Sequence, residues 1–188
     1  GYIYRGLKPV HWSPSSKTAL AEAELEYPEG HISRSLYAAF RLTSLAPAVQ
    51  PVLEPFLPHL GVAIWTTTPW TIPANLAVSV NPDLTYAVVE IESEANNVQT
   101  QNYPSLQSKY LIVAADLVER LSATLSMNLT IKATVMGKDL EHSTYRHPLF
   151  DRESPVVIGG DYVTTESGTG LVHTAPGHGQ EDYMVGQR

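Results

Sequence analysis

Cysteine is absent from the 188 residues, and that absence excludes disulfides, thiolate chemistry and cysteine-based zinc sites. Long apolar runs are absent as well, and none approaches the roughly 20 residues that a transmembrane helix needs. No basic, apolar leader opens the chain, so we expect no signal peptide. Apolar residues make up 43% and charged residues 16% of the sequence, which is typical of a folded domain rather than a disordered segment.

Positive charge is also scarce. The 12 Lys and Arg residues face 19 Asp and Glu residues, which gives a net charge of −7. Because autonomous nucleic-acid binding depends on cations that neutralise phosphates, the chain alone should hold nucleic acid weakly. A nucleic-acid substrate would then be held by another part of a larger molecule. The sequence starts at Gly1 and stops at Arg188 inside an expected helix, so we interpret residues 1–188 as one domain of a longer polypeptide.

Short strands separated by turn residues dominate the expected secondary structure. Residues 18–26 fit a helical turn and a strand equally, and the four prolines within residues 47–60 predict a loop with at most one helical turn. The polar residues 93–108 predict an exposed loop, and residues 115–125 form the clearest amphipathic helix. The expected strands are residues 2–12, 36–42, 62–68, 85–92, 110–113, 129–136, 156–158 and 171–174. This pattern predicts a mainly β fold with minor α, a barrel or a sandwich.

The first notable motif spans residues 65–76 and reads W-T-T-T-P-W-T-I-P-A-N-L. Pro69 cannot donate a hydrogen bond to a strand partner and favours extended geometry at Thr68, so the preceding strand should end near Thr68. Thr66 and Thr67 then carry short, stiff hydroxyl groups that can line a concave space and bind a polar ligand without charge. The alternative explanation is that threonine is simply a good strand residue.

The second motif spans residues 168–183 and reads G-T-G-L-V-H-T-A-P-G-H-G-Q-E-D-Y. Its glycines match neither a phosphate loop nor a dinucleotide fingerprint, and no nucleophile elbow is present. Asp182 falls in the first turn of an expected helix, where the helix dipole alone would explain an acid. His173 is equally consistent with a core histidine. A metal site made of His173, His178 and Asp182 is a further alternative, although the helical spacing of zinc ligands is missing.

Taken together, the two motifs closely resemble the signature stretches of the editing domain of isoleucyl-tRNA synthetase, the insertion called connective peptide 1 in this class I enzyme. The opening stretches Y-R-G-L-K-P-V-H-W-S-P and A-L-A-E-A-E-L-E-Y are similar to the same family. The isoleucyl type is favoured because residues 68–70 read T-P-W, where valyl and leucyl domains carry T-R-P. Residues 176–179 read P-G-H-G, where those domains tend to have P-A-H-D. The synthetic-site signatures H-I-G-H and K-M-S-K-S are absent.

The resemblance implies a β-barrel-like editing domain that hydrolyses the aminoacyl ester of mischarged Val-tRNA(Ile) after transfer, with pre-transfer editing left open. Isoleucine and valine differ by one methylene, which a binding pocket discriminates by only about 1–3 kcal/mol, an argument for which the isoleucyl enzyme is itself the standard example. A second, smaller site would remove the error. The chain would then be an aminoacyl-tRNA deacylase within an isoleucine–tRNA ligase.

The resemblance also implies roles for individual residues. Asp182 would anchor the substrate ammonium group, and Thr67 and Thr68 would act with it in catalysis. Asn75 would bind the substrate or brace the threonine loop, and Trp70 would pack behind the pocket or against the ligand, with core packing favoured. The complete set of expected substrate-binding residues is Thr66, Thr67, Thr68, Trp70, Asn75, His173, His178 and Asp182.

The same resemblance sets the expected partners. We expect no metal, cofactor or covalent intermediate in this domain, because ATP and magnesium serve the synthetic domain of the full enzyme. The partner is the 3′ end of aminoacyl-tRNA(Ile), held mainly by the rest of the synthetase, and the isolated domain should be monomeric and independent of membranes. A bacterial cytoplasm or an organelle, chloroplast or mitochondrion, would suit it. The alternatives are a non-catalytic β-barrel that binds aminoacyl-adenosine or RNA, and a metal-dependent hydrolase.

Overall fold

The computed structural model describes residues 2–6, 10–92 and 108–188. Its chain divides into two compact units, Gly1–Ser33 and Arg34–Arg188, and each unit is described by itself. The expectation of one domain over residues 1–188 stays a prediction. The loop expected over residues 93–108 lies outside the described residues, apart from Ser108, which is buried.

The first unit contains a small hairpin. Strands β1 (His11–Ser13) and β2 (Thr18–Leu20) pair antiparallel, and the 3₁₀-helix η1 (Glu22–Glu24) follows them. The strand predicted over residues 2–12 is wrong for residues 2–6 and 10, because a strand needs a partner and the hairpin offers one only to residues 11–13. The ambiguous segment at 18–26 contains both a strand and a helical turn.

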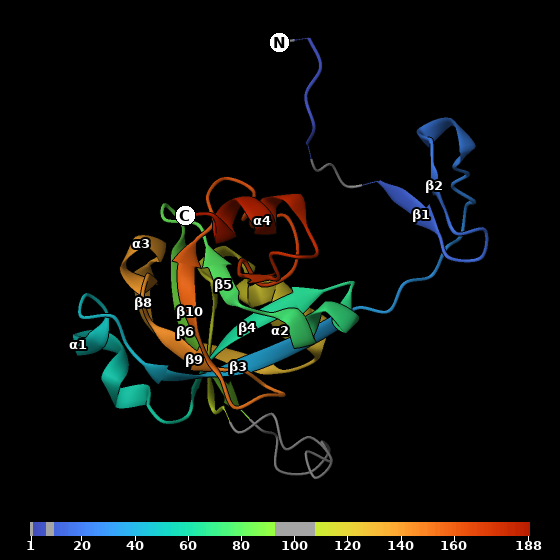
Figure 1. The fold of residues 1–188 in the computed structure, drawn as a ribbon. Coiled ribbons are helices and arrows are strands. Elements are labelled where there is room, and N and C mark those ends of the chain that lie inside the picture. The colour runs from blue at the N-terminus through green and yellow to red at the C-terminus, as the bar shows by residue number, and fades with distance from the viewer. Residues whose placement is uncertain (1, 7–9, 93–107) are drawn as a thin grey trace. The chain divides into compact units, whose positions relative to one another are not determined.

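The second unit is built on a nine-stranded mixed sheet, with the order β11-β5-β10-β9-β3-β4-β7-β6-β8 (Figure 1). The pairs β10/β5 and β4/β7 are parallel and the other neighbours are antiparallel. The sequence did not identify β5 and β9 as strands. The strands are β3 (Leu36–Ser44), β4 (Leu60–Thr66), β5 (Ala77–Val80), β6 (Thr85–Glu92), β7 (Tyr110–Ala114), β8 (Asn128–Met136), β9 (Thr144–Arg146), β10 (Glu153–Ile158) and β11 (Val172–Thr174).

Helices are short and lie between the strands. The predicted amphipathic helix is confirmed as η5 (Ala115–Leu117) followed by α2 (Val118–Leu125), with Leu117, Val118 and Leu121 buried. The proline-rich segment at 47–60 holds two helical turns rather than at most one, because proline suits the first turn of a helix. None of the helices within the described residues has the length and apolar character to cross a bilayer. The helical elements are α1 (Gln50–Leu53), η2 (Glu54–Phe56), η3 (Pro69–Ala74), η5 (Ala115–Leu117), α2 (Val118–Leu125), α3 (Gly137–Leu140) and α4 (Gln180–Gly186).

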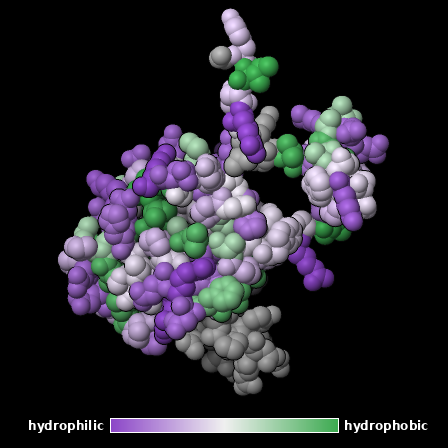
Figure 2. Space-filling view, viewed as in Figure 1, coloured by the Kyte–Doolittle hydropathy of each residue, from purple (hydrophilic) through white to green (hydrophobic). Residues whose placement is uncertain are grey.

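The sheet curls so that its β11 edge returns toward its middle. Strand β11 contacts β4, and the backbone N–H of Ala114, at the end of β7, donates to the carbonyl of Thr169 at 2.8 Å. Apolar side chains such as Phe40, Ile64 and Val88 fill the interior, whereas Figure 2 shows mainly hydrophilic and intermediate residues on the visible face. The curl produces a barrel-like body with a hollow between β4 and the segment that leads into β11.

Candidate functional site

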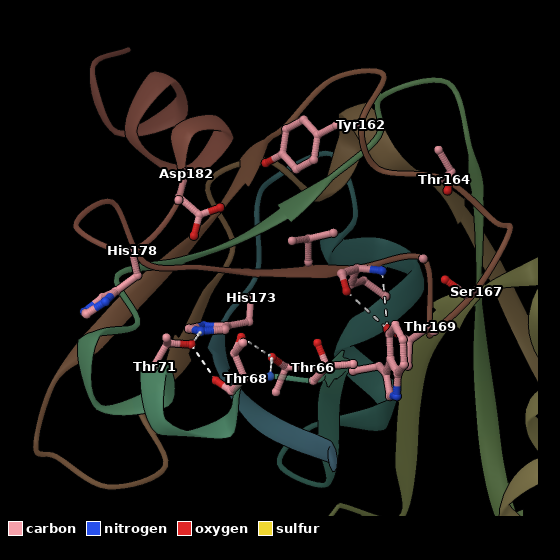
Figure 3. Close-up of a pocket in the computed structure, with 17 residues that line it drawn as sticks. Thr66, Thr68, Thr71, Tyr162, Thr164, Ser167, Thr169, His173, His178 and Asp182 are labelled. Carbon is pink, nitrogen blue, oxygen red and sulfur yellow. Dashed lines mark hydrogen bonds between the residues drawn. The ribbon is translucent and has the colours of Figure 1, made fainter. Parts of the chain in front are cut away.

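A cavity of about 350 Å³ lies between the end of β4, the loop before β11 and the start of α4 (Figure 3). It brings together segments about 100 residues apart in the sequence, which are the two motifs identified above. Six of the eight predicted site residues line it, namely Thr66, Thr67, Thr68, His173, His178 and Asp182.

Residues Thr66–Thr68, here called the threonine corner, follow the end of β4 at Thr66, close to the predicted strand end at Thr68. The Thr66 hydroxyl accepts the backbone N–H of Thr68 at 3.0 Å and shares a hydrogen bond with the Thr68 hydroxyl at 3.2 Å. The Thr71 hydroxyl donates to the carbonyl of Thr68 at 2.8 Å. The Thr66 and Thr71 hydroxyls are therefore fixed by neighbouring backbone, and Thr67 and Thr68 are exposed residues that line the cavity.

The segment Gly168–Leu171, here called the glycine loop, forms the opposite wall of the cavity. Gly168 and Gly170 have φ of +73° and +77°, a region that disfavours residues with a Cβ. A Cβ on Gly170 would lie 2.3 Å from the Cβ of Ala114, and one on Gly168 would lie 3.1 Å from the Trp65 ring. The buried Tyr86 hydroxyl donates to the Gly170 carbonyl at 2.8 Å. The loop backbone is thus pressed against β4 and β7 and lines the cavity.

Asp182 lies in the first turn of α4 and is half-buried. Its Oδ2 accepts the backbone N–H of Ala175 at 2.9 Å, which ties the carboxylate to the residue that follows β11. Among the described residues that line the cavity, Asp182 alone carries a carboxylate and none is Lys or Arg. A cation is therefore the charged group that this cavity favours.

His173 comes from β11 and is only 7% exposed. Its Nδ1 lies 2.8 Å from the Asn75 side-chain nitrogen, and its Nε2 lies 2.8 Å from the Thr71 hydroxyl. Burial lowers the pKa of His173, and the negative charge of Asp182 partly opposes that effect. Both ring nitrogens are engaged by protein partners, so the single lone pair of the neutral ring already accepts a hydrogen bond and is not free to bind a metal.

Two predicted site residues lie elsewhere. Trp70 is 71% exposed, so the favoured core packing of Trp70 is wrong: in the short helix η3, Thr71 and Ile72 face the interior and Trp70 faces solvent. Asn75 is fully buried and outside the cavity lining, and its side chain contacts Ala77, His173 and Tyr145. The expected bracing of the threonine loop stays a prediction. Contact of either residue with substrate stays a prediction.

Several lining residues were not predicted from the sequence. Thr71 belongs to the first motif and Thr169 to the second, so their motifs already pointed to them. Tyr162, Thr164 and Ser167 stand before the second motif, in a segment for which no site role was predicted. No group of three or more His, Cys, Asp or Glu side chains suited to a metal ion is found within the described ranges.

Two buried histidines next to η3 predict an acid-sensitive fold. His147 is 2% exposed, and its Nδ1 accepts the backbone N–H groups of Leu149 and Phe150 at 3.1 and 3.2 Å. Burial lowers the pKa of both His147 and His173. The unfolded chain therefore binds more protons below about pH 6.5. The free energy of unfolding should be at its full value above that pH and should fall as the pH drops below it.

Urea unfolding at pH 7.5 and 5.5 measures this effect. We expect a lower midpoint at pH 5.5, and we expect His147→Gln to weaken the dependence on pH. The exposed His31 offers a control, since His31→Gln should leave the dependence as it is. Equal midpoints at the two pH values would contradict the assignment of buried neutral histidines.

Comparison with known sequences identifies close relatives of this chain. The chain is 76% identical to "Isoleucine--tRNA ligase" of Nostoc punctiforme over 189 residues and 74% identical to that of Nostoc sp. over 188 residues. The corresponding protein of Gloeothece citriformis is 70% identical. In each case the match covers 100% of this chain and 19% of the relative, so the chain spans about a fifth of the length of these relatives.

Solved structures show the same fold. The crystal structure of GlLeuRS-CP1 has a TM-score of 0.58 at 17% identity, covering 80% of this chain and 58% of that one. The editing domain of the P. knowlesi cytosolic leucyl-tRNA synthetase has a TM-score of 0.55 at 14% identity, covering 84% and 64%. The predicted mainly β, barrel-like fold of the editing-domain type is confirmed.

The sequence model of the family "tRNA synthetases class I (I, L, M and V)" matches residues 1–154. That range includes the whole threonine corner and stops before the glycine loop, while the close relatives extend the match over the entire chain. The resemblance stated from the two motifs is therefore confirmed, and the chain belongs to the family of class I tRNA synthetases for isoleucine, leucine, methionine and valine.

Proposed function

We propose that this chain is the editing part of an isoleucine–tRNA ligase and hydrolyses the aminoacyl ester of mischarged Val-tRNA(Ile). The observation that carries the proposal is the shared cavity, in which one carboxylate faces a corner of threonine hydroxyls. The names of the close relatives support the isoleucine enzyme. The P. knowlesi neighbour is described as an editing domain, which supports the reaction class.

Asp182 is the group we assign to the substrate's ammonium. An aminoacyl ester carries a protonated α-amino group, and a charge-assisted hydrogen bond to a carboxylate is the strong way to hold such a cation. Because Oδ2 already accepts from Ala175, Oδ1 is the oxygen that is left for the ligand. Thr66 and Thr68, across the cavity, then face the ester and the terminal ribose.

Hydrolysis at this site relies on positioning rather than on a strong base. His173 has both nitrogens engaged, so it does not accept a proton from water. A water oxygen held by the hydroxyls of Thr67 and Thr68 attacks the ester carbon, the bond to the ribose oxygen breaks, and the ribose oxygen receives the proton. Backbone N–H groups of the glycine loop stabilise the oxyanion. The ester is already activated, so holding it and the water in the geometry of attack lowers the activation free energy of hydrolysis by several kcal/mol.

Size selection follows from the same walls. His173 is buried and held at both nitrogens, so its ring can limit the length of the side chain that enters beside the ammonium site. A wall that rejects one methylene needs to supply only about 1–3 kcal/mol. We propose that valine fits and isoleucine does not.

The longer enzyme must hold the tRNA. This chain has a net charge of −7, which opposes tight autonomous binding of RNA, and it spans 19% of its relatives. We propose that only the 3′ end of the tRNA reaches the cavity and that the remaining contacts belong to the other parts of the ligase. The cyanobacterial relatives favour a bacterial cytoplasm as the place of action.

Deacylation of Val-tRNA(Ile) by the ligase that contains this chain tests the proposal. We expect hydrolysis with and without a chelator, since no step uses a metal. Loss of hydrolysis with the chelator would support the metal-dependent alternative, and binding of a valyl-adenosine ester without cleavage would support the non-catalytic one.

A bulky residue at the threonine corner should block the site. Thr68 is exposed at the cavity, so the ring in Thr68→Phe would occupy space meant for the ligand. We expect kcat/KM for Val-tRNA(Ile) deacylation to fall at least about tenfold, the equivalent of ~1.4 kcal/mol. Thr68→Ser retains the hydroxyl and should stay much closer to the parent value. Equal rates for Thr68→Phe and the parent would count against this corner as the substrate site.

A further inference from the structure

We propose that Tyr145 and Asn75, which lie outside the cavity, are positioning residues that hold His173 in one neutral tautomer, with the proton on Nε2. In that state both ring nitrogens are turned to protein partners, and the ring meets the ligand only through carbon. The tautomer follows from hydrogen-bond geometry alone. Its consequence for substrate size rests on the proposed function.

The orientation of the Asn75 amide is fixed by its three neighbours. Nδ2 lies 2.9 Å from the carbonyl of Ala77 and 2.8 Å from Nδ1 of His173, and Oδ1 lies 2.5 Å from the hydroxyl of Tyr145. A carbonyl only accepts, so the amide NH₂ must face Ala77. Oδ1 is then left to accept the Tyr145 proton. The reverse orientation would place two oxygens against each other in a buried site.

The tautomer of His173 follows from this orientation. An amide nitrogen only donates, so Nδ1 of His173 must accept and carries no proton. A neutral ring then has its proton on Nε2, which donates to the Thr71 hydroxyl at 2.8 Å. That hydroxyl in turn donates a hydrogen bond to the carbonyl of Thr68 at 2.8 Å. The chain of donors runs in one direction, from Tyr145 to the threonine corner, with each proton assigned.

A second proton on His173 would break this chain. It would sit on Nδ1, against the NH₂ group of Asn75. The other charged or titratable groups around the ring are Asp182, which favours the protonated form, and His147 and His178, which oppose it. The Arg152 guanidinium donates to the Asn75 backbone carbonyl at 2.5 Å and adds a fixed positive charge near the chain. Neutral His173 also avoids repulsion of an ammonium bound at Asp182.

Tyr145 is suited to this role by its rigidity. It is fully buried, its ring stacks on Phe40 with centroids 5.3 Å apart, and β9 pairs it with Leu42 on β3 and Ser154 on β10. Burial raises the pKa of Tyr145 well above its usual value, so the hydroxyl keeps its proton for Asn75. The position of His173 in the cavity wall is therefore set, through Asn75, by a residue in the middle of the sheet rather than by the loops around the cavity.

Nitrogen-15 NMR of the 188-residue chain labelled at histidine reads the tautomer directly. We expect His173 to show a protonated Nε2 and an unprotonated Nδ1. In Asn75→Asp, a carboxylate replaces the NH₂ group, so Nδ1 should gain a proton. In Tyr145→Phe, the Ala77 carbonyl still faces the amide NH₂, so the proton should stay on Nε2, but Asn75 loses the donor to its Oδ1 and should hold the ring less rigidly. A protonated Nδ1 in the parent, or an unchanged pattern in Asn75→Asp, would overturn the proposal whether or not the chain edits.

Substrate selection gives the second readout, measured with Val-tRNA(Ile) and Ile-tRNA(Ile) in the ligase that contains this chain. Tyr145→Phe should lower the preference for the valyl ester about tenfold, which is the lower end of the discrimination that a pocket achieves for one methylene. Ser143→Ala loses another fully buried hydroxyl, which accepts the backbone N–H of Ala46, and should keep the preference. If both variants change the preference equally, Tyr145 has only a structural role. If the parent hydrolyses neither ester, the proposed function fails while the tautomer result stands.

Discussion

Asp182→Ala should strongly reduce editing and leave aminoacylation intact. With the carboxylate gone, the substrate's ammonium would be desolvated in a cavity whose described lining holds no other carboxylate. Removing one partner of a buried charged pair costs roughly 2–5 kcal/mol. We expect deacylation of Val-tRNA(Ile) to fall at least about thirtyfold, toward a thousandfold or more. Aminoacylation with isoleucine by the longer ligase should remain near the parent rate.

Two variants separate charge from structure in this experiment. Asp182→Asn keeps an oxygen that can accept the Ala175 N–H but loses the charge, so it should fall nearly as far as Asp182→Ala. Glu181→Gln removes one negative charge from the same helical turn without touching the cavity, so it should keep the parent rate. Parent-like deacylation by Asp182→Asn would show that the charge is not the anchor.

Gly170→Ala should cause a large loss of stability. Gly170 has φ of +77° and an added Cβ would lie 2.3 Å from that of Ala114. The left-handed backbone costs a non-glycine residue about 1–2 kcal/mol, and overpacking adds about 1–3 kcal/mol. For a chain of this length, a total of ~2–5 kcal/mol corresponds to a drop in Tm of roughly 4–20 °C.

Thermal unfolding followed by circular dichroism measures the change. Gly177 lies in the same motif, has no positive φ, and would meet nothing within 4 Å if it gained a Cβ. Gly177→Ala should therefore unfold within a few degrees of the parent. A Tm for Gly170→Ala that equals the Gly177→Ala value would contradict the close approach of the glycine loop to β7.

Local sequence signals predicted most of the fold. Alternating or continuous apolar runs marked β3, β4, β6, β7 and β8, since their side chains fill one core, and the spacing of Leu117, Leu121 and Leu125 marked the helix. The three-residue strand β9 was missed, because Thr144–Arg146 carries no period of its own and is a strand only through its pairing with β3 and β10. The strand predicted over residues 2–12 was wrong for residues 2–6 and 10 for the same reason, because pairing partners are set by the tertiary structure.

The site divides in the same way. The resemblance of the two motifs to one family predicted which side chains would share a cavity. Taken alone, each motif also fitted a simpler explanation, namely threonines suited to a strand and an acid in the first turn of a helix. The exposure of Trp70 and the burial of Asn75 depend on the orientation in which the segment containing η3 packs against β9 and β11. No pattern within residues 65–76 encodes that orientation. Tyr145 was invisible from sequence, because its role comes from a contact with Asn75, 70 residues away.

A crystal structure of the chain with a non-hydrolysable valyl-adenosine analogue bound tests the central claim most directly. The account predicts the analogue's ammonium within hydrogen-bond distance of Asp182 and its ester carbonyl between the threonine corner and the glycine loop. The valine side chain should rest against the carbon edge of His173. An ammonium directed away from Asp182, or an analogue bound outside this cavity, would contradict the account.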